Sequence, residues 1–258
     1  MPEGHTIHRL ARDMGELQGR TLRAFSPQKR FTDGAAAVDG EVLKMAEAYG
    51  KHLFLHVANN RSVHVHLGMR GKWLRSTDPS APPLPQARLR LASEEVAWDL
   101  VAPSKCEILE PPGVAALVSR LGPDPLRSDA DLAGVLQVLG RARGPIGAVL
   151  LDQAVVAGVG NVFRSEALHA VGVAPTRAAR SMTESEVTEL WAVLQQMMSR
   201  AVEDGRIITV DGPDRLSLPE SEARKVYKQE QCRDCGAAIV TSEVGGRTAY
   251  QCPVEQPF

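Results

Sequence analysis

The chain begins Met1-Pro2-Glu3, and a proline at the second position can act as a nucleophile once the initiator methionine is removed. The reference pKa of an α-amino group is about 8, so a useful fraction of this secondary amine is unprotonated near neutral pH. Attack of such an amine on an electrophilic sugar carbon gives a Schiff base. The neighbouring Glu3 carboxylate can carry protons beside that amine. The alternative interpretation is that Pro2 only permits removal of Met1.

Cysteines near the C-terminal end have the spacing of a zinc ribbon. Cys232 and Cys235 enclose two residues, and Cys252 follows a predicted hairpin. An all-thiolate ribbon would have a fourth cysteine where this chain has Glu255. Three arrangements are therefore open. Zinc is held by Cys232, Cys235, Cys252 and Glu255, or by the three thiolates and a water molecule, or it is absent and the hairpin rests on packing alone.

Four further residues in turns have side chains suited to nucleic acid. Lys51 follows a Tyr-Gly turn and can reach a phosphate, although most lysines at such positions are only solvated. Met69 lies in a glycine-flanked turn and is either ordinary core or an apolar wedge for a base stack. Asn161 follows a Gly-Val-Gly turn and can cap a helix or donate to a phosphate. Arg247, in the C-terminal hairpin, is a candidate contact to phosphate or base, or simply solvated.

The first element that must position these groups is a helix directly after Glu3. Apolar residues recur at helical spacing from Thr6 to Leu17, which predicts a helix that would fix Pro2 and Glu3 in place. His5 and His8 on this helix have the spacing of metal ligands. No third ligand lies near them in the sequence, which argues against a metal there.

Short alternating segments after this helix predict an antiparallel β-sandwich or barrel of about 110 residues. The expected strands are Thr21–Phe25, Val42–Ala46, Leu53–Val57, Ser62–Leu67, Lys72–Leu74 and Arg88–Leu91. The pattern then becomes helical, with expected helices at 117–121, 129–139, 146–155, 162–171 and 183–203. Thr183 and Glu186 match a capping box at the start of the last helix.

Composition limits the class of protein. The chain has 258 residues, is 43% hydrophobic and carries a net charge of −1. We find no signal peptide and no apolar run near the ~18 residues of a membrane span. Cysteines without an export signal favour a metal site or free thiols over disulfides. Nucleic-acid binding would need a local basic face, because the net charge gives no hint of it.

Together these motifs, in this order, resemble the formamidopyrimidine-DNA glycosylase and endonuclease VIII family of DNA repair enzymes. The resemblance rests on Pro2-Glu3, Gly50-Lys51, the segment Leu151–Leu168 and the C-terminal finger, and it spans the whole chain. It implies an α+β multidomain fold: a β-sandwich over residues 1–112, a linker over 113–127, a helical domain with a helix–two-turn–helix over 128–225, and a zinc-finger-like hairpin over 226–258. DNA would bind in the cleft between the two main domains.

The resemblance also assigns roles by position. Pro2 would attack C1′ of the damaged nucleotide, and Glu3 would act as the acid/base group for sugar-ring opening. Lys51, Asn161 and Arg247 would grip phosphates around the lesion, with Lys51 counted also among the catalytic residues. Met69 would fill the gap left by the extruded base, consistent with enzymes that flip their target out of the duplex. The partner would be damaged DNA, bound by a monomeric bacterial cytoplasmic protein.

The start Pro-Glu-Gly-His-Thr is closer to endonuclease VIII-like members, and to their actinobacterial forms, than to formamidopyrimidine-DNA glycosylases. That branch favours oxidised pyrimidines such as thymine glycol and dihydrouracil. The His66–Met69 turn is more similar to the other branch, so 8-oxoguanine and formamidopyrimidines remain the rival substrates. A damaged-DNA-binding protein that has lost catalysis is the rival from another class.

Overall fold

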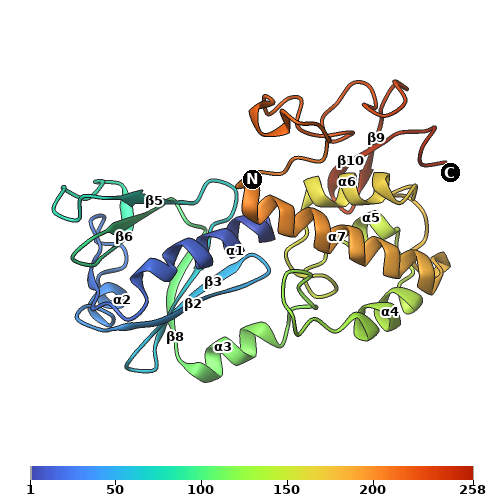
Figure 1. Cartoon of the computed structure of the whole chain (residues 1–258). Coiled ribbons are helices and arrows are strands. Elements are labelled where there is room, and N and C mark those ends of the chain that lie inside the picture. Colours follow the sequence, from blue (N-terminus) through green and yellow to red (C-terminus); the bar gives the residue numbers. More distant parts are fainter. Residues whose placement is uncertain (1, 258) are drawn as a thin grey trace. The chain divides into compact units, whose positions relative to one another are not determined.

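Residues 2–257 are described by the computed structural model, and they form two units, Met1–Arg120 and Leu121–Phe258 (Figure 1). The boundary falls within the expected linker of residues 113–127. Each unit has its own hydrophobic core. No helix among these residues is both long and apolar enough to cross a membrane.

The N-terminal unit contains two antiparallel four-stranded sheets, which confirms the predicted sandwich. The first has the order β1-β6-β7-β5 and the second β2-β3-β4-β8. Their bounds are β1 Arg23–Phe25, β2 Leu43–Tyr49, β3 His52–Val57, β4 Ser62–His66, β5 Lys72–Ser76, β6 Ala87–Ala92, β7 Ala97–Val101 and β8 Lys105–Leu109. Alternate residues such as Leu53, Leu55, Leu89 and Leu91 are buried in one core shared by both sheets.

Helix α1 (Gly4–Asp13) packs against β2 and β3 of this unit. It begins before the expected Thr6, and its predicted end becomes a tight 3-10 turn, η1 (Met14–Leu17). Ile7, Met14 and Leu17 are buried, so the apolar stripe read from the sequence is the packed face. Two short helices complete the unit, α2 (Thr32–Ala36) and α3 (Pro111–Val118).

The C-terminal unit is helical and ends in a hairpin. Its elements are α4 Leu132–Arg141, α5 Ile146–Val149, α6 Asn161–Ala170, η2 Ala179–Ser181, α7 Glu184–Asp204, η3 Arg215–Ser217, β9 Val240–Val244 and β10 Arg247–Gln251. The capping box is confirmed, since Thr183 Oγ1 accepts from Glu186 N and the Glu186 carboxylate accepts from Thr183 N. Helix α6 packs against both α7 and β10.

The helix expected at 146–155 is shorter than predicted, because α5 ends at Val149. Side chains replace the helical hydrogen bonds beyond that point. Asp152 Oδ1 accepts from Ala154 N at 2.9 Å, and Gln153 Oε1 accepts from Gly158 N at 3.0 Å. Gln153 Nε2 also donates to Val159 O. Such local bonds stabilise a compact loop in place of a continuing helix.

Candidate functional site

The N-terminal residues are fixed by the start of α1. Glu3 is the N-cap residue of this helix and is 0% exposed, while Pro2 is partly exposed. The Glu3 carbonyl accepts from Thr6 N at 3.0 Å. Pro2 also lines a groove of about 400 Å³ together with residues of α1 and β5. A buried carboxyl therefore lies next to an accessible Pro2; Met1, whose removal the chemistry requires, lies outside the described residues.

Lys51 lies in the two-residue turn that joins β2 to β3. Gly50 takes the first turn position with φ +56°, a conformation that glycine adopts at no steric cost, and Tyr49 pairs with His52 across the turn. This hairpin holds the backbone of Lys51 at the end of the sheet.

Behind this turn lies a chain of hydrogen-bonded imidazoles that the sequence interpretation missed. His64 Nδ1 is 2.8 Å from Glu107 Oε1, and His64 Nε2 is 2.9 Å from His52 Nδ1. With both rings neutral, His52 donates to His64 and His64 donates to the carboxylate. Burial lowers the pKa of His52 to about 3, with further lowering from His64, His66, Lys105 and Lys51. The alternation of histidines along β3 and β4 was the available signal.

Met69 is at the tip of a tight turn and is 73% exposed. Leu67 O accepts from Gly71 N at 3.1 Å, which closes the turn. Added Cβ atoms would lie 2.7 Å from Ser104 at Gly68 and 2.3 Å from Leu67 O at Gly71, so both positions require glycine. The interpretation of Met69 as ordinary core is therefore wrong, and its side chain is available for contact with a ligand.

Asn161 is the first residue of α6 and is 7% exposed. Its Nδ2 donates to Thr248 O of the hairpin at 3.0 Å. Its Oδ1 is buried and has no hydrogen-bond partner within residues 2–257. A buried acceptor without a partner is suited to a hydrogen-bond donor of a ligand or to a water molecule.

The hairpin that carries Arg247 is held from behind by Arg164 of α6. Arg164 is 0% exposed; its Nη1 donates to Val244 O at 2.7 Å and to Gly147 O at 3.2 Å, and its Nη2 donates to Thr248 O at 2.8 Å. Arg247 is the first residue of β10, directly after the Gly-Gly turn, and pairs with Val244. No prediction had singled out Arg164, because these partners lie far away in sequence.

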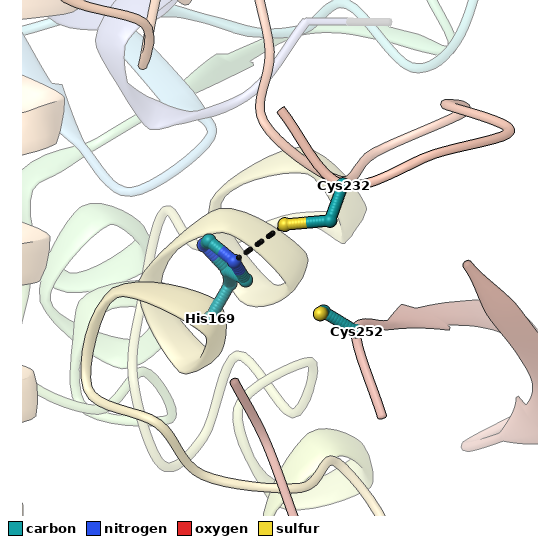
Figure 2. A group of neighbouring side chains, drawn as sticks. All are labelled: His169, Cys232 and Cys252. Carbon is teal, nitrogen blue, oxygen red and sulfur yellow. Dashed lines mark hydrogen bonds between the residues drawn. The ribbon is translucent and has the colours of Figure 1, made fainter. Parts of the chain in front are cut away.

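Cysteines and a histidine gather at the base of the finger (Figure 2). The possible ligand atoms of His169, Cys232 and Cys252 all lie within 4.8 Å of one another, and all three residues are buried. Cys235 Sγ is 3.4 Å from Cys252 Sγ. Two expected ligands, Cys235 and Glu255, are exposed and outside this group of three. The His5/His8 pair is not part of this group.

The donor set fits zinc. Thiolates and imidazole are the ligands of structural zinc sites, in which all ligand positions are filled by the protein. The apolar cluster of the finger is small, with only Val226, Cys232 and Cys252 buried in it. Such a small element usually needs a metal or a disulfide for stability, and its cysteines form no disulfide.

The predicted site residues are divided between the two units. Pro2, Glu3, Lys51 and Met69 belong to the N-terminal unit. The C-terminal unit contains Asn161, Arg247, Cys232, Cys235, Cys252 and Glu255. Within that unit, Asn161 and the hairpin of Arg247 are joined directly through Thr248.

Comparison with known families gives matches in both units. The formamidopyrimidine-DNA glycosylase N-terminal domain matches residues 1–101, and the formamidopyrimidine-DNA glycosylase H2TH domain matches residues 121–211.

Full-length relatives agree with these matches. The protein named Endonuclease 8 1 from Mycobacterium tuberculosis is 43% identical, covering 99% of this chain and 100% of its own length. A formamidopyrimidine-DNA glycosylase from Thermus thermophilus is 31% identical, covering 99% and 97%. Among solved structures, Lactococcus lactis Fpg bound non-covalently to DNA with an AP site has a TM-score of 0.81 at 23% identity, covering 99% of this chain and 100% of that one. This likeness confirms the fold.

Proposed function

The chain belongs to the formamidopyrimidine-DNA glycosylase and endonuclease VIII family, and from this membership we propose that it excises oxidised pyrimidines from DNA. Enzymes of this family are bifunctional DNA glycosylases and abasic-site lyases of base excision repair, and this chain is one of them. The observation that carries the pyrimidine assignment is the higher identity to Endonuclease 8 1 than to the formamidopyrimidine-DNA glycosylases. The start Pro-Glu-Gly-His-Thr supports the same branch.

Pro2 supplies the nucleophile of the proposed reaction. The lone pair of its amine forms a bond to C1′, and the glycosidic C–N bond breaks with the electron pair leaving on the base. Glu3 donates a proton to the ring oxygen as the sugar opens, and the amine proton is lost as the iminium forms. The Glu3 carboxylate, deprotonated by the ring opening, takes a proton from C2′ as the C3′–O bond breaks. Loss of a proton from C4′ to solvent then breaks the C5′–O bond, and water hydrolyses the imine and releases Pro2. The buried position of Glu3 at the N-cap of α1 supports this role.

The remaining predicted residues bind DNA in this proposal. Lys51, Asn161 and Arg247 contact phosphates, so both units contribute to binding. Asn161 would reach a phosphate through the second N–H of its Nδ2, whose first N–H is donated to Thr248 O, and the anchored hairpin of Arg247 supports the contact by that residue. Met69 fills the space left by the extruded nucleotide, which its exposed position at a rigid turn supports.

The metal of the cysteine group is proposed to be zinc in a structural role. Bound there, zinc would cross-link the two ends of the finger and would take no part in the reaction. Cys232, Cys235 and Cys252 are the proposed thiolate ligands. Their position at the base of the hairpin that carries Arg247 links the metal to DNA binding rather than to bond breaking.

A lesion panel tests the substrate assignment. Duplexes containing thymine glycol, dihydrouracil, 8-oxoguanine or a formamidopyrimidine are incubated with the protein, and single-turnover excision rates are measured. We expect the two pyrimidine lesions to be excised at least about tenfold faster, a difference of ~1.4 kcal/mol in the barrier. Faster excision of 8-oxoguanine and formamidopyrimidine would contradict the pyrimidine assignment and favour these two lesions as substrates.

Catalytic and binding-only functions are separated by borohydride in the same panel. An enzyme that forms an imine leaves a reduced covalent adduct with the DNA, whereas a binding module leaves none. Pro2→Gly serves as the matched variant, because it keeps an N-terminal amine but removes the secondary amine. Binding without any adduct or excision on all lesions would contradict the proposal.

A further inference from the structure

His169 lies in the last turn of α6, and the proposed reaction does not use it. Its side chain is 5% exposed, and its Nε2 is 3.4 Å from Cys232 Sγ. Figure 2 shows His169 reaching from the helix toward Cys232, with Cys252 on the adjacent side of the same space. The other ring nitrogen, Nδ1, is buried and has no hydrogen-bond partner among the described residues. The His169 imidazole therefore faces the cysteines, and its Nε2 makes the contact.

The second turn of the finger has the form of a zinc knuckle without its last ligand. Cys252 Sγ accepts from the backbone N of Glu255 at 3.4 Å, and Cys252 O accepts from Gln256 N at 2.9 Å. This backbone would place a side chain at 255 near the metal in a ribbon with a cysteine there. The Glu255 side chain is instead exposed to solvent. The finger lacks the fourth thiolate and has a buried histidine close to Cys232 and Cys252.

Two distances among the four candidates match a pair of ligands on one zinc, although Cys235 lies outside the three residues whose ligand atoms are all within 4.8 Å of one another. Two ligand atoms bound to one zinc at about 2.0–2.3 Å in a tetrahedron lie about 3.4–3.8 Å apart. His169 Nε2 to Cys232 Sγ measures 3.4 Å, and Cys235 Sγ to Cys252 Sγ also measures 3.4 Å. These two pairs share no atom and together contain all four candidates. Cys235 further interacts with the thiol of Cys232.

We propose that His169 is the fourth ligand of the zinc centre, which is then held by Cys232, Cys235, Cys252 and His169. Three thiolates and one imidazole are an established donor set for structural zinc. The inference rests on the proposed zinc centre but replaces the expected ligand Glu255. With this ligand, the zinc centre joins the finger to α6, whereas a centre with Glu255 would lie within the finger alone.

Helix α6 is then attached to the C-terminal segment along its whole length. Asn161 and Arg164 hold the hairpin through Thr248 O, and Arg164 also holds Val244 O. One turn further on, Glu166 accepts from the backbone N of Val226 at 3.0 Å. His169 adds the metal bond at the end of the helix. Loss of zinc is therefore expected to loosen Arg247 relative to Asn161.

Substitutions in the full-length protein test the ligand set. His169→Phe keeps a buried ring of similar size but cannot bind zinc, and His169→Cys restores a ligand. Glu255→Gln and Asp234→Asn are matched controls for the two acidic side chains near the group; Asp234 Oδ2 is 3.9 Å from His169 Nε2 but is paired with Lys225 Nζ at 3.0 Å. Zinc content is measured by mass spectrometry of the metal, and release is timed in excess chelator.

We expect one zinc per chain in the wild type, in Glu255→Gln, in Asp234→Asn and in His169→Cys. His169→Phe should release zinc at least about tenfold faster. After replacement of zinc by Co²⁺, His169→Cys should show stronger thiolate-to-cobalt absorption than the wild type, because it adds a thiolate.

Unchanged zinc retention in His169→Phe would overturn the role of His169, and loss of zinc in Glu255→Gln would assign the position to Glu255. Absence of zinc from the wild type would contradict the metal centre itself. The borohydride adduct of the wild type reports bond formation at Pro2 and not the metal ligands, so failure of the glycosylase assignment remains distinguishable from failure of the ligand set.

Discussion

The exposed fraction of a side chain helps to distinguish the roles proposed for single residues in this chain. Glu3 is fully buried at the start of α1, whereas Met69 is 73% exposed at a turn fixed by two glycines. An exposed methionine contributes little to the core of a folded protein. The exposure of Met69 is therefore consistent with the proposed contact with DNA.

Replacement of Met69 by alanine is predicted to leave folding intact and to impair repair of duplex DNA. We expect a change in the free energy of unfolding within about 0.5 kcal/mol, because the side chain is exposed. Excision from duplex DNA should become about tenfold slower, because the barrier rises by ~1.4 kcal/mol. The reason is that no side chain then fills the space left by the flipped nucleotide. The measurements are urea unfolding and single-turnover excision. Met45→Ala, at an exposed methionine on β2, is the control that should change neither; equal loss in both variants would contradict the wedge role.

At the scale of elements, the sequence pattern predicted those features that depend on residues close together in the chain. The capping box at Thr183, the apolar stripe of α1 and the alternating strands β3 and β4 all depend on neighbours in the sequence, and all were predicted. The helix predicted at 146–155 is longer than the observed α5. The side chain of Gln153 forms hydrogen bonds with the backbone of the following loop, and the spacing of apolar residues does not indicate such bonds. His169 and Arg164 were missed because most of their partners, Cys232, Val244 and Thr248, lie 63 to 84 residues away in sequence.

Arg164 is predicted to be the main anchor of the finger hairpin. Replacing it by leucine leaves the buried carbonyls of Gly147, Val244 and Thr248 without this donor. We expect a loss of about 3 kcal/mol or more in the free energy of unfolding, and weaker DNA binding as Arg247 loses its support. Chemical unfolding and a DNA-binding titration measure the two effects.

Arg200→Leu on α7 is the control for Arg164, because its ion pair with Asp211 is at the surface and contributes less than about 1 kcal/mol. Equal stability of the Arg164 variant and this control would show that the hairpin is held by other contacts.

The histidines of β3 and β4 predict a loss of stability in acid. Burial holds the pKa of His52 at about 3, below the 6.5 of the free side chain. Between these values the unfolded chain binds a proton that the folded chain does not, so stability falls as pH drops from 6.5 toward 3. One such group contributes up to about 1.4 kcal/mol per pH unit.

His52→Gln should therefore show a shallower decline in the free energy of unfolding between pH 6.5 and 5 than the wild type. Denaturant unfolding at several pH values measures the slope. His8→Gln, on α1, should retain the wild-type slope. An unchanged slope in the His52 variant would mean that this imidazole does not limit stability in acid.

For the whole molecule, the net charge of −1 offers no general attraction to DNA, so binding depends on a few placed cations. Lys51 belongs to the N-terminal unit and Arg247 to the C-terminal unit. Each unit has its own core, but the proposed reaction needs groups from both.

Salt dependence of DNA affinity is predicted to show that both units bind in one complex. Lys51→Ala and Arg247→Ala should each reduce the magnitude of the negative slope of log affinity against log salt by about 1, and the double variant by about 2. Lys44→Ala, at an exposed position on β2, should leave the slope unchanged. A double variant whose slope is no smaller in magnitude than that of either single variant would contradict simultaneous contact by the two units.

The most direct test of the account is to identify the atom that bonds to the sugar. The protein is trapped on a lesion duplex with borohydride, digested with trypsin, and the modified peptide is sequenced by mass spectrometry. The account predicts the mass of the reduced sugar on the nitrogen of Pro2, in the peptide that ends at Arg9, with Met1 absent. An adduct on Lys51 or another lysine, or full activity with Met1 retained, would contradict it.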